Sequence, residues 1–110
     1  MIIFPETWTM LDKINYLQRK ILLNSMMYYT EDKSYISDQY YDSCCKQLVK
    51  LQDEYGEGFI DDSEFGYAYY DFDGSTGFHL AGRLTRDDRN KLLDMNTIKL
   101  NREVQKKWAL

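Results

Sequence analysis

Residues 28–42 read Tyr-Tyr-Thr-Glu-Asp-Lys-Ser-Tyr-Ile-Ser-Asp-Gln-Tyr-Tyr-Asp, and this stretch predicts the junction of two helices. Ser37 can accept a hydrogen bond from a free N–H group of the following turn, as the residue before a helix often does. Asp38 comes next, where the positive end of the helix dipole favours a carboxylate. Asp38, Tyr41 and Asp42 stand at positions i, i+3 and i+4, so we expect their side chains to share one helix face.

Two further tyrosines, Tyr28 and Tyr29, end the first helix on the same side of the junction. Carboxylates and phenol rings are therefore expected to gather in one small region, which suits a flat ligand with hydroxyl groups, such as a nucleoside. Asp38 and Asp42 would accept hydrogen bonds from the ligand or pair with a partner's cation, because an exposed helix start favours the ionised carboxylate over acid–base work. The alternative is structural: the tyrosines fill the seam between two amphipathic helices, and the aspartates cap.

The first helix is predicted over residues 10–28. Apolar residues recur there at helical spacing, at Met10, Ile14, Leu17, Ile21 and Tyr28. Thr9 and Asp12 resemble a capping box, with Asp in place of the usual Glu. Four polar residues lie mostly off the apolar stripe and are expected to face solvent: Lys13, Gln18, Arg19 and Lys20.

The second helix is predicted over residues 38–55, with Gly56 placed to end it. Its inner face should carry Tyr41, Cys44, Cys45, Leu48, Leu51 and Tyr55. The short crossing makes the two helices an antiparallel αα-hairpin. Cys44 and Cys45 are neighbours and do not form an ordinary disulfide, so we expect reduced, partly buried thiols in a cytoplasmic protein.

The remainder of the chain, residues 58–110, reads differently. Phe65, Tyr67 and Tyr69 alternate with small or polar residues, which indicates a half-buried strand. Asp73-Gly74 is a turn signal, so a small β-hairpin ribbon is predicted over about 65–81. Thr85 should cap a C-terminal helical segment that contains Leu92. The expected fold class is mainly α with a small β-hairpin, in one domain: the helical pair over 10–57, and the ribbon and C-terminal helix over 58–110.

The composition limits the classes of partner. The chain has 110 residues and a formal net charge of −4, which argues against direct nucleic-acid binding and against an anionic membrane surface. No apolar run reaches the length of a membrane span, and residues 1–5 do not read as a signal peptide. An acidic domain instead suits a basic protein partner, such as the DNA-binding groove of a nucleic-acid enzyme.

Acidic and aromatic residues interleave beyond residue 60, and this pattern predicts a protein-binding edge. The candidate partner-binding residues are Asp62, Glu64, Tyr67, Tyr69, Tyr70, Asp71 and Asp73. A charge run of this kind is also typical of a merely solvated face, so both interpretations stand.

The sequence provides little for catalysis. Asp71-Phe72-Asp73-Gly74 superficially resembles a phosphatase nucleophile motif and a ligase adenylation motif, but Asp71 occupies the position of the adenylated lysine and a hairpin turn explains the segment better. His79 is the only histidine, which rules out a triad or a site based on histidine pairs. A calcium loop is also absent, so no metal site is expected.

The stretch from residue 14 to residue 57 resembles the N-terminal helical domain, called Ia, of bacterial NAD-dependent DNA ligases. The family pattern is Tyr, then His or Tyr, an acidic crossing, Ser/Pro-Asp-x-x-Tyr-Asp and a leucine-spaced helix. It appears here as Tyr28-Tyr29, Glu31-Asp32, Ser37-Asp38, Tyr41-Asp42, Leu48 and Leu51. In that family the domain docks the nicotinamide mononucleotide (NMN) half of NAD. The resemblance implies that the ligand-binding positions are Tyr28, Tyr29, Asp38, Tyr41 and Asp42.

The expected function is that of a small non-catalytic binding protein, because the adenylation lysine and the other ligase domains are missing from this sequence. Its Ia-like face would bind NMN or NAD, with no cofactor required, or would dock on a protein partner. The alternative is a phage-encoded acidic inhibitor of a host nuclease or defence enzyme, comparable to anti-CRISPR proteins in size and charge.

Overall fold

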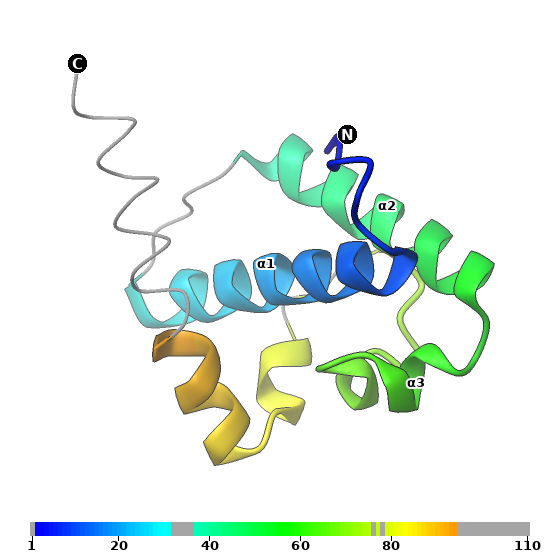
Figure 1. Ribbon diagram of the computed structural model, residues 1–110. Coiled ribbons are helices and arrows are strands. Elements are labelled where there is room, and N and C mark those ends of the chain that lie inside the picture. Colours follow the sequence, from blue (N-terminus) through cyan, green and yellow to red (C-terminus); the bar gives the residue numbers. More distant parts are fainter. Residues whose placement is uncertain (1, 32–36, 76, 78, 95–110) are drawn as a thin grey trace.

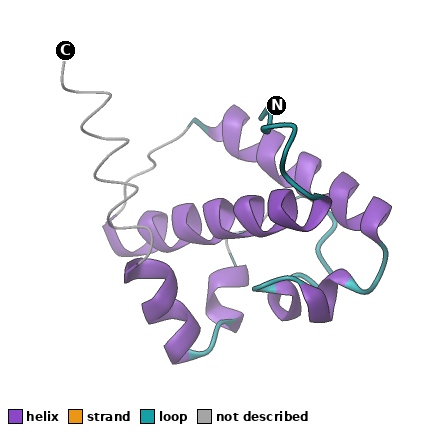
Figure 2. Ribbon diagram, in the orientation of Figure 1, coloured by secondary structure: helices purple, strands orange, loops and turns teal. Residues whose placement is uncertain are grey.

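The computed structural model describes residues 2–31, 37–75, 77 and 79–94. The elements are α1 (Met10–Glu31), α2 (Asp38–Tyr55), α3 (Phe59–Asp62) and two 3-10 turns, η1 (Gly66–Ala68) and η2 (Leu80–Arg83). Residues 86–94 are also helical. In Figure 1 α1 crosses the middle of the molecule, with α2 on one side and η2 and segment 86–94 on the other. The predicted mainly helical fold is confirmed. Figure 2 shows helices, joined by loops, on both sides of α1.

Both long helices begin with the predicted caps. The Thr9 backbone N–H donates to Asp12 Oδ2 over 3.0 Å, and the Asp12 N–H donates back to Thr9 Oγ1 over 3.1 Å. These reciprocal bonds use N–H groups that have no partner inside the helix. Ser37 Oγ accepts from the Tyr40 N–H over 3.1 Å at the start of α2. Gly56 ends α2 with φ +95°, a conformation that favours glycine.

The hydrophobic core joins α1 and α2 to the residues that follow them. The buried side chains of α1 and α2 form one cluster with Phe65, Tyr69, Leu80, Leu84 and Leu92. Thr85 caps the last helical segment, because its Oγ1 accepts from the Asp88 N–H. The predictions made for residues 95–110 lie outside the described residues.

The predicted β-hairpin is wrong: the described residues between 65 and 81 contain turns and 3-10 helix but no strand. Phe65, Ala68 and Tyr69 are fully buried, whereas Tyr67 and Tyr70 are exposed. This burial pattern has the spacing of a helical turn, not the alternation of a strand. Asp73 and Gly74 do form the predicted turn: Asp73 Oδ1 accepts from the Ser75 N–H over 2.9 Å, and Gly74 has φ +87°.

Gln18 was expected to face solvent, but its side chain is fully buried. Its Nε2 donates to Gln52 Oε1 and to Ser63 Oγ, each over 3.0 Å, and its Oε1 accepts from the Phe65 N–H over 3.2 Å. The Gln18 backbone carbonyl accepts from the Tyr69 hydroxyl over 2.9 Å. One polar residue of α1 therefore holds both α2 and the segment after α3, and its partners satisfy the polar atoms that burial would otherwise penalise.

Two glycines allow close backbone contacts in the second half of the chain. A Cβ added to Gly66 would lie 2.4 Å from the carbonyl oxygens of both Phe59 and Ile60. A Cβ added to Gly77 would lie 2.7 Å from the Tyr41 hydroxyl. Only a residue without a side chain fits these positions, so the segment after α3 can pack directly against its neighbours.

Candidate functional site

The two acids predicted to bind ligand lie on the surface at the start of α2. Asp38 occupies the first turn of α2 and Asp42 the second, and both are exposed. The Ser37 cap fixes where the helix starts, so the two carboxylates lie about one turn, roughly 6 Å, apart along the helix axis. Both face solvent and are available to accept hydrogen bonds from a ligand.

Tyr41 points into the protein, away from that surface, and is 6% exposed. Its hydroxyl oxygen lies 3.1 Å from Ser25 Oγ, which in turn lies 3.1 Å from the Gly77 carbonyl oxygen. Burial raises the pKa of Tyr41 well above its ordinary value, an effect that its hydrogen bond to Ser25 partly offsets. Tyr41 therefore joins α1 to α2 beneath the surface that carries Asp42.

Tyr28 and Tyr29 lie in the last turns of α1, but their side chains fall outside what the structure describes. The expectation that these phenols meet Asp38 and Asp42 therefore remains a prediction. The helix continues past the predicted end at Tyr28, to Glu31.

A groove of about 520 Å³ runs along the outer face of α2. It is lined by Gln39, Asp42, Ser43, Lys46, Gln47 and Lys50. The Gln47 side chain also clamps the start of the chain: its Nε2 donates to the Ile2 carbonyl over 2.8 Å, and its Oε1 accepts from the Ile2 N–H over 3.0 Å. Lys46 and Lys50 were missed as site residues, although the i, i+4, i+8 spacing from Asp42 is visible in the sequence.

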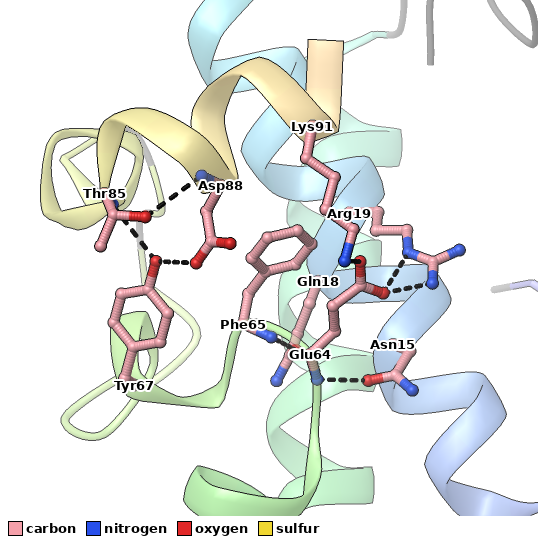
Figure 3. Close-up of polar contacts among 9 residues, drawn as sticks. All are labelled: Asn15, Gln18, Arg19, Glu64, Phe65, Tyr67, Thr85, Asp88 and Lys91. Carbon is pink, nitrogen blue, oxygen red and sulfur yellow. Dashed lines mark hydrogen bonds and ion pairs between the residues drawn. The ribbon is translucent and has the colours of Figure 1, made fainter. Parts of the chain in front are cut away.

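The predicted partner-binding residues do not all lie on the surface. The Glu64 carboxylate accepts from the Arg19 guanidinium and lies 3.8 Å from the Lys91 ammonium, and the Glu64 N–H donates to Asn15 Oδ1 over 2.8 Å (Figure 3). These contacts tie the segment after α3 to α1 and to segment 86–94. The charge of Glu64 is therefore used inside the fold.

The predicted partner-binding tyrosines differ in exposure. Tyr69 is fully buried, and burial raises the pKa of its hydroxyl well above the ordinary value. Tyr67 is 38% exposed and donates its hydroxyl to Asp88 over 2.5 Å, a contact that Figure 3 shows beside the Thr85 cap. Tyr70 is 61% exposed. Tyr69 therefore belongs to the core, and of the three rings Tyr70 presents the most area to a partner.

The remaining acids of the predicted partner-binding set have local partners. Asp71 receives a two-pronged hydrogen bond from Arg83, and this guanidinium holds the pKa of the carboxyl below its usual range. Asp73 accepts from Ser75 within the turn, which also lowers the pKa of its carboxyl. Asp62 accepts from the Tyr55 hydroxyl over 2.6 Å. Each of these three acids is therefore bound by a side chain of the protein itself.

Neither metal nor thiol chemistry stands out in the part of the chain that the structure describes. Among those residues no group of three or more His, Cys, Asp and Glu side chains could hold a metal ion. Cys44 and Cys45 are free and buried, and burial raises the pKa of Cys45 to about 12, so its thiol is protonated at neutral pH. None of the described helices combines the length and apolar character that crossing a bilayer requires.

The protein is a small helical domain that is built on an αα-hairpin and carries exposed acids on α2. A family model for the DNA ligase-like, N-terminal NAD+-binding domain matches residues 8–64, which is just over half of the chain, and the protein belongs to this family. Comparisons with curated proteins and with solved structures gave no match. The family segment contains α1, α2 and α3 and ends at Glu64, the residue that Arg19 binds.

Proposed function

We propose that the protein binds a nicotinamide nucleotide, NMN or the NMN half of NAD, on the outer face of α2, and that it does so without catalysis. The family match supports the class of ligand, since the matching family is that of an NAD+-binding domain. The observation that carries the proposal is the groove in which Asp42 lies beside Lys46 and Lys50. The buried thiols suit a cytoplasmic location, which is also part of the proposal.

The charges of the groove complement those of NMN. NMN carries a cationic pyridinium ring at one end and a phosphate at the other, with ribose hydroxyls between them. Lys46 lies about 6 Å and Lys50 about 12 Å along the helix axis from Asp42, given the rise per residue of an α-helix. An acid followed by two ammonium groups in one row suits a zwitterionic ligand: Asp42 would attract the ring, and the lysines would attract the phosphate.

The test is a thermal-shift and NMR titration of the full chain with NMN. We expect NMN at millimolar concentration to raise the melting temperature, because a ligand that binds only the native state stabilises it. Asp42→Asn and Lys46→Gln should each weaken the shift. Glu54→Gln and Arg89→Gln remove matching charges from exposed positions outside the groove and should leave it unchanged.

Nicotinamide riboside lacks the phosphate, so its binding distinguishes the contribution of Asp42 from that of the lysines. Its binding should respond to Asp42→Asn but not to Lys46→Gln. The proposal fails if NMN perturbs no amide of residues 38–50, or if the two groove variants bind NMN as the parent chain does.

A further inference from the structure

A second hollow, of about 300 Å³, lies between the end of α2, the start of α3 and residues 69–72. Asp53, Glu57, Tyr70 and Phe72 are among the residues that line it. The hollow has a packed base: Tyr69 is fully buried and contacts Phe72 edge-on, with 5.2 Å between the ring centroids. The site therefore combines the exposed Tyr70 and the half-buried Phe72 with two carboxylates above a packed floor.

The two charged residues that line this hollow, Asp53 and Glu57, are both acidic. From residue 51 to residue 82 the sequence contains no lysine and no arginine, although acids recur throughout. Glu64 and Asp71 are paired with Arg19 and Arg83. Asp53 and Glu57 are exposed, and within the described part of the chain neither makes an ion pair. Their charge is therefore free to attract a cation from outside.

The molecule already contains one example of the chemistry that this hollow offers. The Arg83 guanidinium lies 4.9 Å from the Tyr70 ring centroid and forks onto both carboxylate oxygens of Asp71, at 2.6 and 3.1 Å. Stacking on an aromatic ring while binding a carboxylate with two hydrogen bonds is a property of arginine that lysine does not share. Tyr70 stays 61% exposed beside Arg83, so much of its ring is open to a second group.

We propose that this hollow binds an arginine side chain from a basic segment of a partner protein. The arginine would lie against Tyr70 and Phe72 and pair with Asp53 and Glu57, as Arg83 lies against Tyr70 and pairs with Asp71. The site differs from the predicted ribbon edge, because it uses Asp53 and Glu57 at the end of α2 and does not include Glu64, Asp71 or Asp73. It also stands apart from the nucleotide groove, since the two hollows share no lining residue.

The experiment is an NMR titration of the full chain with a hexa-arginine peptide. The peptide should perturb the amides of Asp53, Gly56, Glu57, Tyr70 and Phe72. The double variant Asp53→Asn/Glu57→Gln should weaken binding by about tenfold, the effect of losing two exposed ion pairs of moderate strength. Tyr70→Ala should weaken binding as well. Hexa-lysine should bind more weakly than hexa-arginine, because it cannot fork or stack in the same way.

The matched control is the double variant Glu54→Gln/Asp87→Asn, which removes the same charge from exposed positions outside the hollow. It should change the affinity by less than about twofold, since exposed charges that do not contact the peptide are largely screened. Equal losses in the two double variants would overturn the proposal by showing that only net charge matters. A neutral hexa-citrulline peptide that binds as well as hexa-arginine would also overturn it, as would perturbations confined to residues 38–50.

Discussion

Ser25 Oγ lies 3.1 Å from the Tyr41 hydroxyl oxygen, and this contact couples the C-terminal half of α1 to the start of α2. Ser25 also reaches the Ile21 carbonyl and the Gly77 carbonyl, at 2.9 and 3.1 Å. The hydroxyl pair therefore lies where α1, α2 and the loop before η2 meet. The resemblance to the ligase domain implied a ligand-binding role for Tyr41, but its hydroxyl makes contacts within the core.

Tyr41→Phe should consequently lower the stability and leave nucleotide binding unchanged. The loss of one buried hydrogen bond is expected to lower the free energy of unfolding by about 1 kcal/mol. Urea unfolding and an NMN titration of the same variant measure the two effects separately. A variant that keeps its stability but no longer binds NMN would assign the phenol to the ligand site.

Gln18→Leu should destabilise the protein much more than the same substitution at an exposed glutamine. The change leaves the Phe65 N–H without its acceptor in the core and removes a donor from Gln52 Oε1, so we expect a loss of about 3 kcal/mol. Gln39→Leu makes the same chemical change on the surface of α2 and should alter the free energy of unfolding by less than about 0.5 kcal/mol. Equal denaturation midpoints for the two variants would contradict the assigned role of Gln18.

The two glycines in the 3-10 turns allow a similar comparison. Gly66→Ala would place a methyl group 2.4 Å from two backbone carbonyl oxygens, so we expect more than about 3 kcal/mol of destabilisation or no folded protein. At Gly82 an added Cβ meets nothing within 4 Å, and Gly82→Ala should be neutral or slightly stabilising. Circular dichroism during thermal unfolding distinguishes them, and a Gly66→Ala protein as stable as the parent would disprove the close contact.

The protein should lose stability at alkaline pH, whereas neutral and mildly acidic pH should leave its core unaffected. Burial raises the pKa of Cys45 from 9.0 to about 12 and raises the pKa of Cys44, Tyr41 and Tyr69 above their ordinary values. The unfolded chain then releases these protons at a lower pH than the folded chain. The stability they contribute is complete below about pH 9 and is lost as the pH rises toward 12.

Urea unfolding at intervals between pH 7 and pH 11 measures this dependence. Cys45→Ala should flatten the decline that begins near pH 9, whatever it does to the stability at pH 7. A stability that stays constant up to pH 11 would contradict the burial of these groups.

The parts of the fold that depend on local signals were predictable. The caps at Thr9 and Ser37 and the glycine end at Gly56 are read from neighbouring residues, and all three are confirmed. The ribbon prediction failed because Phe65, Tyr67 and Tyr69 alternate in the sequence, whereas burial follows Phe65, Ala68 and Tyr69. A small residue such as alanine gives little hydrophobic signal, so the helical spacing was hidden.

Contacts between residues that lie far apart in the sequence could not be predicted in the same way. Gln18 looks like a surface residue because its buried partners Gln52 and Ser63 come far later in the chain. The exposed positions of Asp38 and Asp42 agree with the expectation from the sequence. The spacing of Lys46 and Lys50 from Asp42 is visible in the sequence, but the groove that these residues line is seen only in the structure. The roles of these residues in binding stay predictions, as does the alternative of a phage-encoded inhibitor.

The clamp between Gln47 and Ile2 has a practical consequence for anyone who purifies this protein. Because both ends of the Gln47 amide hold the Ile2 main chain, a polyhistidine tag fused ahead of Met1 would emerge beside the α2 groove. Its imidazoles and linker carbonyls would then compete with an added nucleotide at the site that we propose, beside Asp42 and Lys46. Titrations on protein from which the tag has been cleaved avoid this interference.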